Sequence, residues 1–95
     1  MKYDLGEFKG VKNIINDKWT SIPNQFIIYF EYGTVFQSYN SIIAIKYNDG
    51  KTIIGKNYKY SKTTGKYRNI YLNETLKKTD MKIKYKVYTY DAELV

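Results

Sequence analysis

Four runs rich in β-branched and aromatic residues follow one another through the middle of the chain, and only one to three residues separate neighbouring runs. Such runs are typical of β-strands, which we predict at residues 24–31, 34–39, 41–47 and 51–55. Asn48-Asp49-Gly50 is the clearest turn, because Asp-Gly readily takes the positive φ angles of a tight hairpin. Connections this short join antiparallel strands, since parallel neighbours need a crossover of about a dozen residues. The sequence therefore predicts an antiparallel meander.

A short helix is predicted before this meander. Val11, Ile14 and Ile15 follow the i, i+3, i+4 spacing of a helix face, and Trp19 stands four residues beyond Ile15. Gly10 precedes the segment and Pro23 follows it. We therefore expect a helix near residues 11–18, with its apolar side docked on the sheet.

A second helix is predicted to open at Ser61, whose hydroxyl can accept a backbone N–H of the first turn. Tyr67, Ile70 and Tyr71 are expected to form its inward side. Gly65 lies in the first turn, where glycine costs roughly 1 kcal/mol relative to alanine. Such a glycine allows close approach by a ligand or another backbone, and tight packing explains it equally well.

The chain is expected to finish with a third helix from about Glu74 to Ile83 and a last strand from Lys84 to Asp91. The strand is inferred from alternating residues, and the face carrying Val87 should be buried. We predict one α+β domain over residues 1–95. It should be an antiparallel sheet of four to five strands, a meander plus the C-terminal strand, with two to three short helices packed on one face.

Composition argues against an enzyme. The chain has no histidine and no cysteine, which removes the usual general base and the thiolate metal ligands. None of the nine carboxylates stands in a recognisable catalytic pair or metal spacing, and no glycine-rich nucleotide fingerprint is present. We therefore expect no catalytic residues, no metal and no cofactor.

Membrane insertion is not expected either. The longest apolar runs, residues 26–30 and 42–45, are far shorter than the roughly 20 residues that span a bilayer. The N-terminal residues include acids where a signal peptide needs an apolar stretch. These features predict a cytoplasmic protein.

Positive charge is concentrated in the second half of the chain. The net charge is +7, and residues 49–95 hold eleven cations against five acids, whereas residues 1–48 hold five cations against four acids. One explanation is a solubilising surface that reflects coding bias. The other is an anionic partner, either nucleic acid or the acidic surface of a protein.

The densest part of this positive charge is the segment KNYKYSKTTGKYR, residues 56–68, which contains no carboxylate. Lysine and arginine can bind phosphate, and tyrosine can stack on bases. The candidate binding residues are Lys56, Lys59, Lys62, Lys66, Arg68, Tyr58 and Tyr60. In extended backbone Tyr58 and Tyr60 would share one face, opposite Lys59. Reversing the charge of Lys62, Lys66 and Arg68 together is expected to leave folding intact and to abolish binding.

Residues 61–66 within this segment, SKTTGK, place hydroxyls, a glycine and lysines at a predicted helix N-terminus, which suits anions. The order differs from that of a Walker motif. Ordinary capping by Ser61 with solvated lysines is the alternative explanation. The other dense polar stretch, Phe36 to Ser41, is expected to hold side chains that satisfy nearby turn backbone.

Two stretches together, FQSYNSIIA (residues 36–44) and YSKTTGKYRN (residues 60–69), resemble a family of small uncharacterised proteins. Those proteins occur in phages, plasmids and other mobile elements of low-GC Gram-positive bacteria. With IPNQFII (residues 22–28), the resemblance covers about residues 8–90. In that family an acid precedes the Tyr-Ser pair, whereas here the residue is Lys59, which makes this member more basic.

The resemblance implies no shared activity, but it implies a setting in which small accessory proteins bind and block host machinery. The first hypothesis is a stoichiometric inhibitor of a host nucleic-acid or defence enzyme, such as a CRISPR effector or a restriction nuclease. It would act in the host cytosol on a host protein or nucleoprotein complex, with Arg68 and exposed tyrosines as anchors. The second hypothesis is a direct nucleic-acid binder, for single strands. A plain structural subunit is a third, and a monomer or weak dimer is expected.

Overall fold

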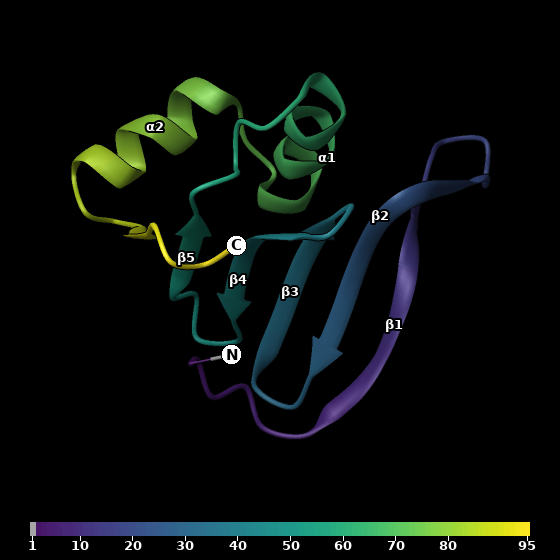
Figure 1. Ribbon diagram of the computed structural model, residues 1–95, viewed down its shortest axis with the longest axis horizontal. Coiled ribbons are helices and arrows are strands. Elements are labelled where there is room, and N and C mark those ends of the chain that lie inside the picture. Colours follow the sequence, from purple (N-terminus) through teal and green to yellow (C-terminus); the bar gives the residue numbers. More distant parts are fainter. Residues whose placement is uncertain (1) are drawn as a thin grey trace.

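A six-stranded sheet forms one layer of the molecule and two helices form the other (Figure 1). The computed structural model describes residues 2–95. The elements in chain order are β1 (Phe8–Ile15), β2 (Ser21–Phe30), β3 (Gly33–Ser38), β4 (Ser41–Tyr47), β5 (Thr52–Gly55), α1 (Lys62–Leu72), α2 (Leu76–Lys84) and β6 (Thr89–Asp91). The α+β class is confirmed, and the expected four to five strands are fewer than the six observed.

The predicted meander is present, since β1 to β5 lie side by side in chain order and each neighbouring pair is antiparallel. The turn between β4 and β5 is held by its own residues. Gly50 has a φ of 98° and its N–H donates to the carbonyl oxygen of Tyr47 at 3.0 Å. The side chain of Asp49 accepts the N–H of Lys51 at 2.9 Å. Asn-Asp-Gly therefore acts as the sequence indicated.

The helix predicted near residues 11–18 is wrong, because residues 8–15 form the edge strand β1. β1 pairs with β2 and its register shifts twice, between Phe8 and Gly10 and between Asn13 and Ile15. Val11 lies opposite Ile28 and is 56 % exposed, whereas Ile14 is buried. These register shifts break the simple alternation of a strand, which is why the apolar spacing looked helical. Trp19 lies in the following turn, exposed and with a φ of 63°.

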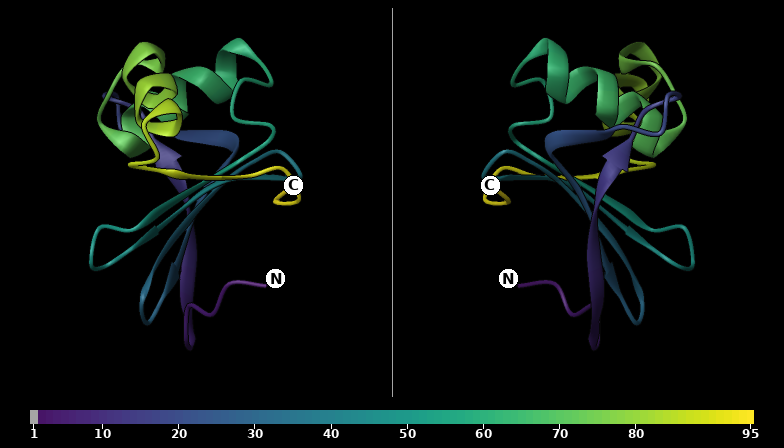
Figure 2. Two further views of the ribbon diagram at one scale, coloured as in Figure 1. Left: turned by 90° about the vertical axis from the view of Figure 1, so that its left-hand side faces the viewer. Right: turned by 90° about the vertical axis from the view of Figure 1, so that its right-hand side faces the viewer.

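The predicted final strand is only partly correct. Lys84 belongs to α2, Lys86 has a φ of 61° in a turn, and Val87 is exposed, so the expected burial of its face is wrong. β6 begins at Thr89 and pairs with β5 in parallel. A parallel pair requires a crossover, and α1 and α2 form it. Both helices consequently pack on one face of the sheet, while the chain ends lie on the other (Figure 2).

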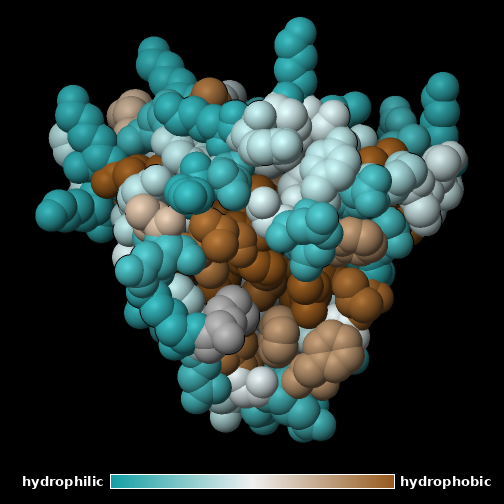
Figure 3. All heavy atoms as spheres, in the orientation of Figure 1, coloured by the Kyte–Doolittle hydropathy of each residue, from teal (hydrophilic) through white to brown (hydrophobic). Residues whose placement is uncertain are grey.

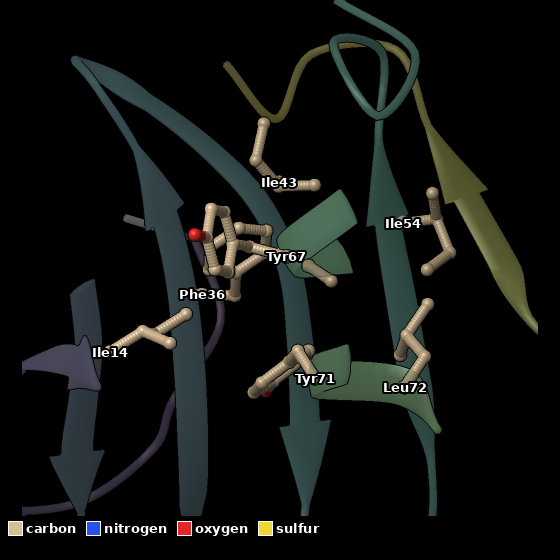
Figure 4. Close-up of a cluster of buried hydrophobic side chains, with 8 residues drawn as sticks. Ile14, Phe36, Ile43, Ile54, Tyr67, Tyr71 and Leu72 are labelled. Atoms are coloured by element: carbon tan, nitrogen blue, oxygen red, sulfur yellow. The ribbon is translucent and has the colours of Figure 1, made fainter. Parts of the chain in front are cut away.

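Apolar side chains fill both faces of the sheet. On the helix side, Phe36 of β3 and Ile54 of β5 pack beneath Tyr67 and Tyr71 of α1 (Figure 4). Ile70 was expected to point inward with these tyrosines, but it is exposed. On the opposite side, three strand residues pack against residues from the two chain ends; this cluster comprises Val35, Ile45, Ile53, Leu5 and Leu94. The sheet is thus a platform that fixes the position of α1.

Candidate anion-binding site

The excess positive charge of the chain lies entirely in the crossover between β5 and β6. Residues 56–88, here called the helical layer, hold ten cations against two carboxylates, a net of +8, while the remaining residues hold six cations against seven acids, a net of −1. Hydrophilic side chains project around the helices in Figure 3, whereas hydrophobic side chains gather over the sheet below them. The charge imbalance between the two halves of the sequence is therefore a difference between the two layers of the fold.

Glu74, one of the two carboxylates in the layer, is occupied by internal partners. Its Oε1 accepts hydrogen bonds from Lys82 at 2.8 Å and from the Tyr88 hydroxyl at 2.7 Å, and its Oε2 accepts one from Thr79 at 2.6 Å. Burial alone would raise the pKa of Glu74, but these three hydrogen bonds together lower it below its ordinary value. Glu74 stays ionised and contributes little negative charge to the surface.

Asp80, the second carboxylate, is also engaged. Its Oδ1 accepts the Tyr58 hydroxyl at 2.6 Å and lies 3.5 Å from Nζ of Lys59. Burial, followed by the hydrogen bond to Asp80, raises the pKa of Tyr58 well above its usual value. Tyr58 therefore remains a neutral hydrogen-bond donor. Because both acids are paired internally, the outer surface of the layer is dominated by lysine.

The sheet fixes the first turn of α1 through a buried hydrogen bond. Ser61 has the extended backbone of an N-cap, and its Oγ accepts the N–H of Thr64 at 3.1 Å, so the predicted cap is confirmed. Thr64 Oγ1 lies 2.8 Å from Oγ of Ser38 at the end of β3. Ser38 thus makes a long-range contact, although local hydrogen bonds were expected in its stretch. Gln37, whose side-chain N–H donates to the Tyr39 carbonyl, behaves as expected.

Beside this helix start is a hollow of about 690 Å³. The residues that line it are Lys59, Ser61, Lys62, Gly65, Lys66, Arg68, Asn69 and Leu76, and the atoms that they expose there are mostly apolar. The first backbone N–H groups of a helix have no acceptor within the helix, and they make its N-terminus a favourable place for an anion. Four cationic residues therefore converge where the helix dipole also favours negative charge.

Arg68 is the exception among these cations, because it is only 3 % exposed. Its guanidinium donates from Nη1 to the Tyr58 carbonyl oxygen and from Nη2 to Oδ1 of Asn69 at 2.8 Å. Burial lowers the pKa of Arg68, although a guanidinium stays charged at neutral pH. Arg68 is thus held against the 56–60 segment and does not project into solvent as the lysines do.

A model of a family of unknown function, DUF8033, matches residues 9–87. The chain belongs to this family. The match covers β1 to β5 and nearly all of the helical layer, so both layers lie within the stretch that the family describes. No curated protein and no solved structure matches the chain.

The structure separates the seven candidate residues into three groups. Lys59, Lys62, Lys66 and Arg68 line the hollow together. Lys56 and Tyr60 are exposed outside it, and Tyr60 is 70 % exposed. Tyr58 is partly buried, with its ring edge-on to Tyr90 at a centroid distance of 6.3 Å. Tyr58 and Tyr60 lie in successive turns, because their N–H groups donate to the carbonyl oxygens of Gly55 and Asn57, so the condition of extended backbone, under which they would share one face, is not met.

Sequence reasoning missed the contribution of α2 and the loop that follows it. Exposed lysines at positions 77, 78, 84 and 86 extend the positive surface beyond the 56–68 segment. Nothing in the spacing of these lysines along the sequence placed them beside α1. Among the described residues no group of three or more acidic side chains could hold a metal ion, and no helix is long and apolar enough to cross a bilayer.

Proposed function

We propose that this protein is a non-catalytic binding protein whose helical layer docks on the phosphate backbone of nucleic acid. The observation that carries the proposal is the charge separation between the layers. A net charge of +8 on one layer of a small fold is typical of proteins that bind a polyanion. Exposed tyrosines within or next to the layer, Tyr60 and Tyr85, offer rings on which unpaired bases can stack. The proposed setting is the cytoplasm of a host cell.

The test is binding of a fluorescent single-stranded oligonucleotide, followed by anisotropy at low and moderate salt. Affinity should fall steeply as salt rises, with a log–log slope of about −0.7 for each phosphate that is neutralised. A variant with Lys62→Glu and Lys66→Glu should bind much more weakly and show a shallower slope. Both lysines are exposed, so this variant should fold normally.

The matched control is Lys9→Glu with Lys51→Glu, which makes the same change in net charge at exposed positions outside the helical layer. The control should retain most of the affinity. Equal weakening by the two double variants would show that only net charge matters and would contradict a docking face.

A second candidate is the stoichiometric inhibitor of a host nucleic-acid or defence enzyme. It is favoured by aliphatic side chains that the helical layer leaves exposed, namely Ile70 at 57 %, Met81 at 46 % and Val87 at 67 %. Protein interfaces use such groups in their apolar core, whereas a phosphate backbone does not. Absence of oligonucleotide binding at low salt would remove the first candidate. Inhibition of a nuclease at a one-to-one ratio, abolished by Val87→Asp, would then support the second.

A further inference from the structure

The buried guanidinium of Arg68 has no counter-charge. No carboxylate lies within 4 Å of it among residues 2–95, and its Nε has no hydrogen-bond partner there. Removing a charge from water is costly, so buried charges in proteins are normally paired. The nearby carboxylate, Asp80, is already bound to Tyr58 and Lys59. Asp80 and Glu74 therefore act on Arg68 only from beyond contact distance, and this buried cation lines the hollow at the start of α1.

Gly65 lies directly against the guanidinium, without a side chain of its own. A Cβ at this position would lie 3.6 Å from both Nη atoms of Arg68 and 3.9 Å from Cζ, in ordinary contact with the guanidinium. Gly65 and Arg68 both line the hollow, so the missing side chain leaves space over the charged group. Glycine is otherwise a poor choice inside a helix, because alanine is more stable there. Close approach of a ligand to the guanidinium would explain why the position tolerates that disadvantage.

We propose that the hollow seats one phosphate group, with Arg68 as its buried counter-ion and Lys62 and Lys66 as its exposed partners. The first turn of α1 adds the positive end of the helix dipole. This inference rests on the proposed function in one respect, since it names the site at which a nucleic-acid phosphate is held. The phosphate can be an internal phosphodiester, a terminal phosphate or a free ion, and the experiment separates these sources.

The test uses inorganic phosphate as the probe, with backbone amide shifts of the full chain recorded by NMR during a titration. Shifts should saturate and should be largest for residues 61–66. Gly65→Ala should weaken phosphate binding by tenfold or more while raising the midpoint of unfolding in urea. This opposite effect on binding and stability is diagnostic, because a purely structural glycine would change stability alone.

A second variant, Gly65→Asp, places a carboxylate where the phosphate is proposed to sit. It should raise the midpoint of unfolding further and abolish the saturable phosphate shifts. Wild-type phosphate affinity in either variant would overturn the proposal. So would shifts that rise without saturation at lysines throughout the chain, since these indicate diffuse attraction only.

Oligonucleotides distinguish the source of the phosphate and separate this proposal from the proposed function. A terminal-phosphate site predicts that a 5′-phosphorylated strand binds more tightly than the same strand without the phosphate, and that Gly65→Ala removes the difference. An internal-phosphodiester site predicts equal binding of the two strands, weakened equally by Gly65→Ala. Saturable binding of inorganic phosphate with no oligonucleotide binding would support the site while overturning the proposed function. Oligonucleotide binding that Gly65→Ala leaves unchanged would support the function and overturn the site.

Discussion

Arg68 shows how one residue can have a role that composition conceals. In the sequence it is one of five cations in thirteen residues, and nothing distinguishes it from the exposed lysines. The helix buries it next to Tyr67, and it fastens the 56–60 segment by hydrogen bonding to the Tyr58 carbonyl. Arginine suits this position, because its planar fork can reach two acceptors at once.

Reversal of the charge at Arg68 should therefore destabilise the fold. Arg68→Glu buries a carboxylate against two hydrogen-bond acceptors, and we expect a loss of about 3–5 kcal/mol in the free energy of unfolding. Urea denaturation measures this loss. The control is Lys62→Glu, an exposed change in the first turn of α1, which should stay within about 0.5 kcal/mol of wild type. The sequence predicted that reversing Lys62, Lys66 and Arg68 together would leave folding intact, whereas the burial of Arg68 now predicts a loss of stability. An Arg68→Glu variant as stable as wild type would contradict this new prediction.

At the scale of elements, the sequence predicts best where local chemistry alone determines the outcome. The Asn-Asp-Gly turn and the Ser61 cap depend on neighbouring residues and were predicted correctly. β4 also has the predicted bounds, 41–47, because its dense run of β-branched residues indicates a strand without reference to its partners. β1 was mistaken for a helix because its form is set by pairing with β2, whose partner residues lie six to 22 positions further along the chain. The β-branched residues Val11, Ile14 and Ile15 were the overlooked indication of a strand.

The candidate site shows the same division. The cluster of cations at the start of α1 was readable from the sequence, since a cap, a glycine and lysines lie within six residues. The burial of Arg68 and the position of α2 beside α1 could not be predicted from the sequence, because tertiary packing determines both. The alternation in residues 84–91 also misled, since tyrosine and lysine alternate as readily in a turn as in a strand.

The start of α2 offers a prediction about pH. Glu74 precedes the N-cap Thr75, and its carboxylate accepts hydrogen bonds from Lys82 and Tyr88 at the beginning of the helix. Because its folded pKa lies below the ordinary value of about 4.3, Glu74 contributes stability above that pH and loses it as pH falls further. Glu74→Gln should reduce the free energy of unfolding by about 1.5–3 kcal/mol at neutral pH, as expected for hydrogen bonds to a charged group.

Urea denaturation at several pH values tests this expectation. The difference between wild type and Glu74→Gln should narrow below about pH 4, as the carboxyl group becomes protonated. Glu93→Gln, at a carboxylate whose side chain is 85 % exposed, serves as the control and should remain close to wild type. A constant difference at all pH values would show that the loss comes from packing and not from the charge of Glu74.

At the scale of the whole molecule, β6 joins the two layers to the two chain ends. Asp91 of β6 accepts a hydrogen bond from the Tyr3 hydroxyl at 2.7 Å and lies 2.9 Å from Nζ of Lys2. The backbone N–H of Lys56, where the helical layer begins, donates to the carbonyl oxygen of Leu94 at 3.3 Å. The beginning, the crossover and the end of the chain therefore meet beside β5.

Protonation of Asp91 should loosen this junction. The hydrogen bond from Tyr3, followed by that from Lys2, lowers the pKa of Asp91 to about 2. Since an ordinary Asp has a pKa of about 3.9, the contribution of Asp91 to stability is complete above that pH and disappears as pH falls through about 2. Asp91→Asn should remove the decrease in the free energy of unfolding that protonation of Asp91 causes as pH falls. Asp17→Asn, in an exposed turn, should not remove it. Denaturation curves between pH 5 and pH 2 that coincide for wild type and Asp91→Asn would contradict the assignment.

The parallel pairing of β5 with β6 has a consequence for synthesis of the chain. All five strands of the meander precede the cationic crossover, and the first 55 residues carry six cations against five acids. A nearly neutral sheet can thus emerge from the ribosome and assemble before any of the strongly basic chain is exposed. The lysine-rich part follows the strands on which α1 packs, and the three residues of β6 then join it to β5. We expect this order to limit the time during which an unfolded polycation is free to bind ribosomal RNA.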